Sequence, residues 1–242
     1  MDTPADKLIA ARALPLAEQA YDRLEELIIA CELKPGQALS INDLQTVVQL
    51  GRTPIHQAVS RLASDTLIVI RPRHGLRIAP IDLTRDRTLL GLRRDMERFV
   101  VRLAAERSGP THRNQFLHIA RLLRKQDDDL DIATFNRLDR RIDQLLTSAT
   151  GEPFLENTLR PLHTIFRRIG WVYHNWAAPK EGLGKTVLGH LAMIEAVADG
   201  DADRAAEASD RLMGFMDSVF AIIEREVDPA RLDCTLETQL AD

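Results

Sequence analysis

One stretch of the chain decides how the rest is interpreted: Gly51-Arg52-Thr53-Pro54-Ile55-His56-Gln57-Ala58-Val59-Ser60-Arg61-Leu62. Its apolar residues recur at i, i+3, i+4 and i+7, which predicts one buried stripe of a helix made by Ile55, Ala58, Val59 and Leu62. Thr53 is expected to cap this helix, with Pro54 at the first helical position, where the missing N–H costs nothing. The opposite face then carries polar side chains and no acid: Arg52, His56, Gln57, Ser60 and Arg61.

This polar face suits the major groove of DNA. Arginine can bond the edge of guanine through two hydrogen bonds, and glutamine can do the same with adenine. An ordinary amphipathic surface helix shows the same pattern, so the neighbouring segments have to decide between the two interpretations.

The segment before this stretch predicts two further helices. One begins at Leu16 and is stopped by Lys34-Pro35-Gly36, with an apolar face made by Tyr21, Leu24, Leu27, Ile28 and Cys31. Ser40 is expected to cap a short helix over residues 41–48, which a tight connection joins to the polar-faced helix. Two short helices joined this closely are a helix-turn-helix candidate, with the second helix as the reader.

The segment after it predicts a two-stranded β wing. Residues 67–71 are rich in β-formers, residues 72–75 read as a turn, and residues 76–79 alternate like a returning strand. Between residues 41 and 80 there are five arginines and only two acids, Asp43 and Asp65, which gives this segment a charge of +3 in a chain of net charge −4. A local basic patch of this kind is the electrostatic signature of DNA binding.

The bulk composition excludes several classes of protein. The chain has 242 residues, 45% of them hydrophobic, which suffices for one large domain or two smaller ones. Its two cysteines lie far apart without metal-type spacing, which favours a reduced, cytoplasmic protein. Neither a signal peptide nor an apolar run of roughly 20 residues is present, so we expect no membrane partner.

From residue 82 helical periodicity dominates to about residue 228. The chain is therefore expected to be mostly α: an N-terminal winged helix-turn-helix with a small β wing over residues 16–80, an all-helical bundle of about six helices over 82–228, and a loose tail over 229–242.

The N-terminal segment resembles the winged-helix domain of GntR-type bacterial transcription regulators. That family usually reads Leu-Gly-Val-Ser-Arg-Thr-Pro-Val-Arg-Glu-Ala-Leu where this chain has Gln49-Leu50-Gly51-Arg52-Thr53-Pro54-Ile55-His56-Gln57-Ala58-Val59. His56 replaces an arginine that contacts DNA in the family, and Asn42 stands where many members carry a basic residue. The resemblance, together with the polar face, predicts DNA contacts from Asn42, Arg52, Thr53, His56, Gln57, Arg61, Arg73, His74 and Gly75.

The helical segment resembles the effector-binding domain of the FadR-type (FCD) subgroup. The resemblance rests on Phe135-Asn136-Arg137-Leu138-Asp139, Gly151-Glu152-Pro153-Phe154-Leu155, Gly189-His190 and Asp199-Gly200-Asp201-Ala202. Together the two resemblances cover about residues 16–227 in the order that the family has.

The FCD resemblance raises the question of a metal, because many members bind a divalent ion through one Asp and three His. The corresponding positions here are Asp139, Asp143, His190 and Leu212, of which only Asp139 and His190 match. Asp139, Asp143 and His190 could form a weak site completed by water, but tight zinc binding normally needs a fuller donor set. We therefore expect no cofactor and no stoichiometric zinc.

Other roles for these residues stay open at this stage. The two aspartates could instead pair with Arg140, Arg141 or a base on another helix, and His190 could be a hydrogen-bonded core histidine. Arg93 could hold an effector carboxylate or form an i, i+4 surface pair with Glu97. The expected effector pocket comprises Arg93, Asp139, Asp143, His190 and Leu212. The fourth helix of the bundle carries further polar and aromatic groups, more than half of them expected in the core or on the surface: His163, Arg167, Arg168, Trp171, Tyr173 and Trp176.

The sequence thus favours a transcription regulator, most simply a repressor, which binds double-stranded operator DNA as a homodimer. A small-molecule effector, such as an organic acid or related metabolite, is expected to control it. The alternative is an all-helical metal-dependent enzyme or metabolite-binding protein with an incidental basic wing. Against an enzyme, the sequence offers neither a nucleophile–base pair nor a phosphate-binding glycine loop.

Overall fold

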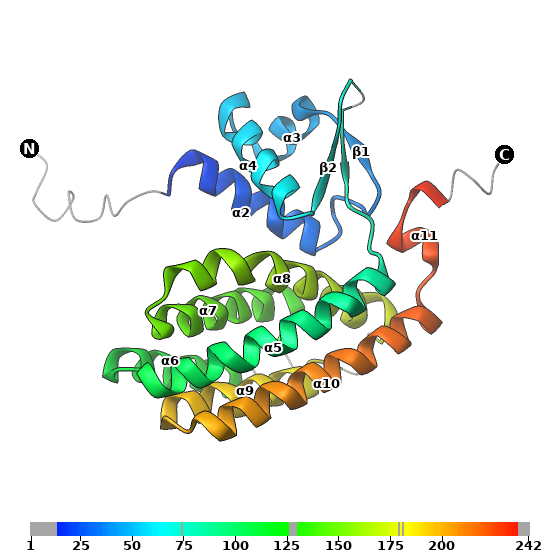
Figure 1. Ribbon diagram of the computed structural model, residues 1–242. Helices are drawn as coiled ribbons and strands as arrows, with labels where there is room; N and C mark the ends of the chain where they lie inside the picture. Colours follow the sequence, from blue (N-terminus) through cyan, green and yellow to red (C-terminus); the bar gives the residue numbers. More distant parts are fainter. Residues whose placement is uncertain (1–13, 74, 126–129, 179, 181, 237–242) are drawn as a thin grey trace, which may run out of the picture. The chain divides into compact units, whose positions relative to one another are not determined.

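The computed structural model describes residues 14–73, 75–125, 130–178, 180 and 182–236. The chain divides between Pro80 and Ile81 into two compact units, which we call the head and the helical unit (Figure 1). The expected fold class is confirmed: a small antiparallel sheet accompanies the helices of the head, and the helical unit is built from helices.

The head contains three helices and three short strands. In chain order they are α2 (Leu16–Ile29), β1 (Ala38–Leu39), α3 (Ile41–Val48), α4 (Arg52–Ser64), β2 (Ile68–Arg71) and β3 (Gly75–Ile78). The predicted stripe of α4 is buried, and it packs with Leu24 and Ile28 of α2 and Leu44 of α3 to form the core of the head.

The start of α3 follows the sequence prediction. The Ser40 hydroxyl accepts from the Asp43 N–H at 3.2 Å, and the Asp43 carboxylate accepts from the Ser40 N–H at 2.7 Å, which completes a capping box. Gln49 then ends the helix in the left-handed conformation, at a φ of 59°. These two ends fix the short turn into α4.

The start of α4 differs from the prediction. The helix begins at Arg52 with Gly51 as its N-cap, and no side chain caps it, so the expected capping by Thr53 is wrong. Pro54 is the third helical residue instead of the first. It is tolerated there because the first four N–H groups of any helix lack an intrahelical partner.

The wing has one more strand than the sequence indicated. The sheet order is β1-β3-β2, antiparallel throughout, with Leu76 of β3 opposite Leu39 on one side and Ile70 on the other. The strand β1 was missed because two residues are too short to show an alternating pattern.

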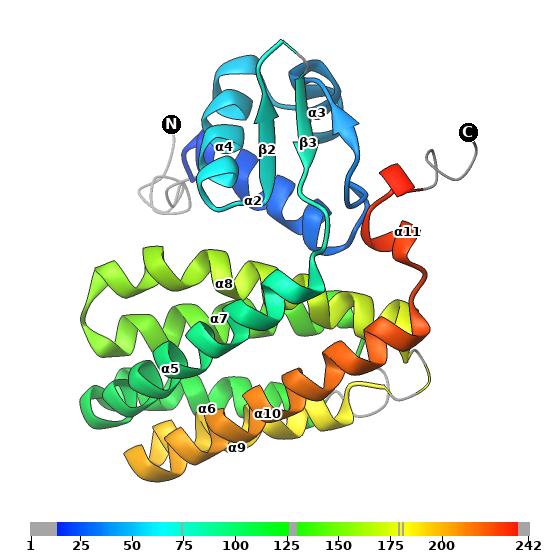
Figure 2. The ribbon, with the colours of Figure 1, turned by 45° about the vertical axis from the view of Figure 1, so that its right-hand side comes forward.

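The helical unit follows the predicted helices closely. Its elements are α5 (Leu83–Arg107), α6 (Pro110–Lys125), α7 (Ile132–Thr150), α8 (Pro153–Val172), the π-helix η1 (Tyr173–Ala177), α9 (Gly184–Asp199), α10 (Ala202–Glu226) and α11 (Pro229–Leu232). Asp82, Asp131 and Asp201 cap their helices through side-chain hydrogen bonds. α10 packs along α5 and α9, and α7 packs against α5 and α8 (Figure 2). No helix among the described residues is long and apolar enough to cross a membrane.

The end of the chain corrects one expectation. Residues 229–236 are not a loose tail: Asp228 caps α11, Leu232 is buried, and the backbone carbonyl of Leu232 accepts from the Ile81 N–H at 2.9 Å. The Arg231 guanidinium lies 5.4 Å from the centre of the Trp176 ring. These contacts fix the segment to the helical unit, whereas residues 237–242 lie outside the described residues.

The pairing of β1 with β3 makes a prediction about Gly75. Its φ is +80°, and a Cβ added there would lie 2.8 Å from the Leu39 carbonyl oxygen. We expect Gly75→Ala to destabilise the sheet by at least ~1 kcal/mol, seen as faster amide exchange in β2 and β3 of the full chain. Gly51→Ser is the control, because Gly51 has a negative φ and a Cβ there would meet only Pro54 Cδ, at an ordinary contact distance of 4.0 Å. Equal amide protection of β2 and β3 in the two variants would show that the sheet does not require glycine at position 75.

Candidate functional site

The head presents the polar face of α4 to solvent. The side chains of Arg52, Thr53, His56 and Gln57 are exposed, as is Asn42 on α3. At the wing tip, Arg73 is exposed at a φ of 68° and Gly75 begins β3, while His74 lies outside the described residues. The sequence-derived DNA-binding residues that the structure describes therefore remain accessible, with one exception.

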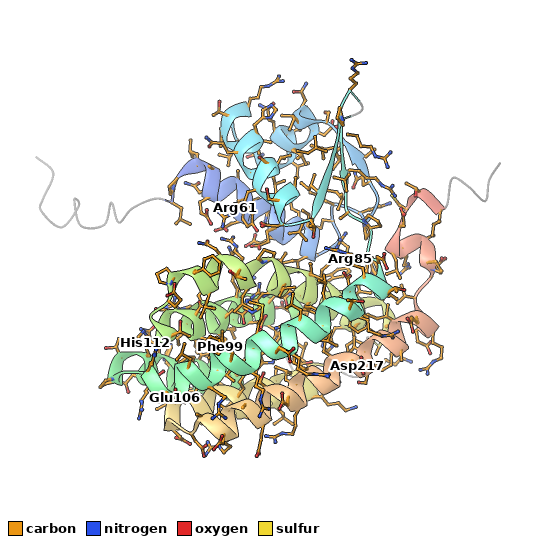
Figure 3. The ribbon with its side chains drawn as sticks, viewed as in Figure 1. Arg61, Arg85, Phe99, Glu106, His112 and Asp217 are labelled. Carbon is orange, nitrogen blue, oxygen red and sulfur yellow. The ribbon has the colours of Figure 1, made fainter. Side chains whose placement is uncertain are left out.

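The exception is Arg61, which the sequence placed with the DNA-binding residues. Its guanidinium forms an ion pair with Glu18 of α2 at 2.6 Å and lies 4.1 Å from the centre of the Tyr21 ring (Figure 3). The pair joins α4 to α2, and the Arg61 side chain stays 40% exposed. Arg61 is thus less accessible than Arg52, and its contact with DNA stays a prediction.

The helical unit encloses a cavity between its helices. Arg93, Asp139, His190 and Leu212 all line it, together with Arg167, as the sequence led us to expect for the first four. Most of the wall is apolar and aromatic: Phe135, Phe166, Tyr173, Met213, Phe215 and Val219. Asp143 does not line this cavity but a second one, next to His163, so its predicted place with the other pocket residues is corrected.

A buried arginine joins the two aspartates of α7. Arg167 of α8 donates from Nε to Asp139 Oδ2 at 2.7 Å and from Nη2 to Asp143 Oδ2. On the other side of Asp139, His190 Nε2 lies 2.9 Å from Oδ1, and the His190 Nδ1 faces the backbone carbonyl of Thr186 at 2.7 Å. All four charged side chains are buried, so each of them depends on its partners.

The same network continues through His163 to α5. His163 Nδ1 lies 3.1 Å from Asp143 Oδ2, and its Nε2 lies 2.7 Å from Glu97 Oε1. Arg93 Nε completes the chain at 3.1 Å from the same Glu97 oxygen, with its guanidinium 5.0 Å from the centre of the Phe166 ring. Three acids, two arginines and two histidines therefore form one buried network across α5, α7, α8 and α9.

The three acids of this network have different pKa values. Burial by itself raises the pKa of Glu97, but His163 and Arg93 outweigh it and lower that pKa to about 2. In the same way Arg167 and His190 overcome the burial of Asp139 and hold its pKa below the ordinary value. Burial raises the pKa of Asp143 to about 6. The negative charges of Asp139 and Glu97 act in the same direction, because they oppose a third ionised carboxylate.

His190 is stabilised in its charged form. Burial alone lowers the pKa of an imidazole, but the hydrogen bond and the charge of Asp139, with the carbonyl of Thr186, raise the pKa of His190 overall. His190 is thus both a hydrogen-bonded core histidine and a wall of the cavity, so the two sequence-based interpretations describe one residue.

The structure identifies the partners of Arg93 and of the two aspartates. Arg93 does pair with Glu97 at i, i+4, but both side chains are buried instead of lying on the surface, and Arg93 lines the cavity. The aspartates pair with a base on another helix, Arg167, whereas Arg141 bonds to Gln115. The sequence named Glu97 only as a possible surface partner of Arg93, and His163 and Arg167 only among the polar groups of the fourth helix. It did not predict that His163 and Arg167 pair with the two aspartates, or that His163 also pairs with Glu97. The signal for this pairing was the matched i, i+4 spacing of Asp139 and Asp143 on α7 and of His163 and Arg167 on α8.

The residues at the family's metal position do not fit a metal. A guanidinium already contacts both Asp139 and Asp143, and Leu212 supplies no donor atom. The Leu212 side chain packs onto Gly189 so closely that a Cβ on that glycine would lie 2.8 Å from Leu212 Cδ1. These contacts favour an ion-pair network over the predicted metal ligand set of Asp139, Asp143 and His190.

Another group in the described part of the chain has metal-type spacing. The side chains of Glu97, Asp143 and His163 each offer a ligand atom, and these atoms all lie within 4.8 Å of one another. By distance alone this group could hold an ion. Arg93 and Arg167 contact its carboxylates.

The network makes a prediction about stability. Asp139→Asn should destabilise the helical unit by about 3–5 kcal/mol, because it leaves the buried charges of Arg167 and His190 without their shared partner. The matched control is Asp210→Asn, which breaks the half-exposed pair with Arg98 and should cost less than ~1 kcal/mol. Denaturant unfolding followed by tryptophan fluorescence measures this, since both tryptophans, Trp171 and Trp176, lie in the helical unit. Similar losses in the two variants would contradict it.

Two family models match the chain, one in each unit. Residues 16–78 match the model of bacterial regulatory proteins of the gntR family, and residues 88–215 match the FCD domain.

The most informative relatives agree with these matches. The HTH-type transcriptional repressor RspR of Escherichia coli K12 is 29% identical over 88% of this chain and 93% of its own length. Among solved structures, Escherichia coli McbR/YncC superposes with a TM-score of 0.74 at 17% identity, over 86% of this chain and 98% of that one. A GntR-type putative transcriptional regulator from Rhodococcus sp. RHA1 superposes with a TM-score of 0.64 at 17% identity and the same coverage. At such identities the superpositions support the fold alone.

Proposed function

Because the chain belongs to the gntR family of bacterial transcription regulators and carries an FCD domain, we propose that it is a repressor that binds operator DNA as a homodimer and is controlled by an anionic metabolite. The chain is a regulator and not an enzyme. Repression is supported by the name of the relative RspR, and a cytoplasmic location follows from the need to reach chromosomal DNA.

The observation that carries the proposal is the exposed polar face of α4. It holds an arginine, a histidine and an amide side chain with no acid among them, and the exposed wing residues Arg71 and Arg73 add positive charge beside it. In a winged helix-turn-helix such a helix enters the major groove, and the wing contacts the adjacent backbone or minor groove.

The first test removes the arginine at the start of α4. Arg52→Ala should cost about 1–3 kcal/mol of discrimination between operator and unrelated DNA, because a bidentate base contact is lost. Arg23→Ala is the control: Arg23 is an exposed arginine of α2 that pairs with Glu26, so discrimination should persist. Genomic footprinting supplies the operator, and fluorescence anisotropy at fixed salt measures the affinities. Equal discrimination in native protein and Arg52→Ala would refute the assignment of α4 as the reader.

The proposed dimer surface lies on α5. Leu92 and Phe99 are 51% and 56% exposed and stand seven residues apart, so they share one face of the helix. Phe99 is labelled in Figure 3. Met96 and Leu103 extend the same heptad pattern and are partly exposed. Since an exposed apolar row at this spacing is what helix pairing uses, we assign it to a second copy of the chain.

The dimer is tested by placing a charge on this face. Phe99→Glu should convert the dimer to a monomer in light scattering at micromolar concentration, because the charge would be buried between two copies. Leu188→Glu serves as the control, since Leu188 is a more exposed apolar residue on α9, away from the α5 face. A native protein that is already monomeric, or a Phe99→Glu variant that stays dimeric, would exclude this surface.

The effector is proposed to be a small organic acid with an apolar or aromatic body. The cavity wall is mostly apolar, and its guanidinium groups, from Arg93 and Arg167, are suited to a carboxylate. Binding there would change the relative population of dimers competent and incompetent for DNA.

A calorimetric comparison tests this assignment. Arg93→Lys should weaken carboxylate binding by about tenfold or more, since lysine cannot form a bidentate contact. Arg98→Lys, on the surface of the same helix, should leave it unchanged. If neutral amide analogues bind as tightly as the acids, the effector is not recognised through its carboxylate.

A further inference from the structure

We propose that Arg167 is the resident cation of this FCD cavity: its guanidinium joins Asp139 and Asp143 where metal-binding members of the family hold a divalent ion. The proposal concerns the chemistry of the helical unit and is independent of the operator and of the effector's identity.

The Arg167 guanidinium contacts both carboxylates of α7. Asp139 and Asp143 lie one turn apart on α7 and face the same side, and Arg167 contacts both, through Nε at 2.7 Å and through Nη2. An arginine keeps its charge at every physiological pH and presents several donors in one plane, so it can neutralise two carboxylates at once. A metal ion at this place would have to displace it.

The family's last donor is missing on α10. The family's last ligand position is occupied by Leu212, whose side chain is buried and packs on Gly189. Leu212 therefore supplies no donor to a metal, whereas Arg167 supplies a permanent positive charge from α8 that needs no donor from α10.

Glu97, Asp143 and His163 are the group with metal-type spacing. Arg93 Nε lies 3.1 Å from the Glu97 carboxylate, Arg167 contacts the Asp143 carboxylate, and His163 bridges the two. Two fixed positive charges beside such a group repel a divalent ion, and the oxygens that would bind it already accept hydrogen bonds. The same network therefore disfavours a metal at either place.

It follows that folding and ligand binding in this unit proceed without a metal. The cation that holds α7 against α8 is covalently part of the chain, so chelators cannot remove it. This distinguishes the chain from relatives in which a bound ion performs the same joining task.

The experiment restores the family's donor set with and without Arg167. The double variant Leu212→His/Asp143→His supplies the missing imidazoles and keeps the guanidinium, and the triple variant adds Arg167→Met. Elemental analysis of full-length protein prepared without chelator should find no stoichiometric zinc in the native protein or the double variant. It should find about one zinc per chain in the folded triple variant, where four donors surround an empty centre.

Several results would overturn the proposal. One is a native protein or double variant that retains one zinc per chain; another is a triple variant that is helical by circular dichroism and binds none. If the triple variant does not fold, the native protein still decides the matter. Its thermal midpoint should be unchanged by EDTA and by excess zinc, and a shift of several degrees with either reagent would show that a metal occupies the site.

Discussion

The contact between Arg167 and the paired carboxylates of Asp139 and Asp143 is the constraint on which the helical unit depends. Removing a charged group from water costs several kcal/mol, and only close partners of opposite charge offset that cost. Here seven ionisable side chains from four helices share one buried network, so their positions are mutually dependent. The cavity wall formed by Arg93, Arg167 and His190 therefore has a fixed geometry before any ligand arrives, which is the condition for selective recognition.

The head uses charge in a different way. Arg61 and Glu18 form a pair between α4 and α2, with the Arg61 guanidinium over the ring of Tyr21. The basic and amide side chains nearer the start of α4 are exposed. One short helix thus divides its polar residues between holding its own position and presenting a surface that DNA can contact. The division is consistent with a family in which the head reads DNA and the helical domain responds to small molecules.

The sequence predicted the helices well because their ends carry local signals. The Ser40 cap follows the prediction, Asp82, Asp131 and Asp201 cap later helices in the same way, and Gly151 and Gly200 end helices in the left-handed conformation. Three elements were missed because they are too short to show a periodic pattern: the strand β1, the π-helix η1 after α8, and the helix α11, which Asp228 caps. Only part of the site could be predicted. Four cavity residues follow from the family resemblance, but the choice of Arg167 as partner is made between helices, and a single sequence does not specify which helices meet.

A double-mutant cycle between Asp139 and Arg167 tests the account most directly, because it measures their coupling apart from the cost of each substitution. Asp139→Asn, Arg167→Met and the double variant are unfolded in denaturant, with tryptophan fluorescence as the probe. The account predicts that the double variant is less destabilised than the sum of the single variants by at least ~1 kcal/mol, because a buried charge without its partner costs more than the absence of both. Additivity within ~0.5 kcal/mol would mean that the two residues do not depend on each other, and the buried network could not be what holds α7 to α8.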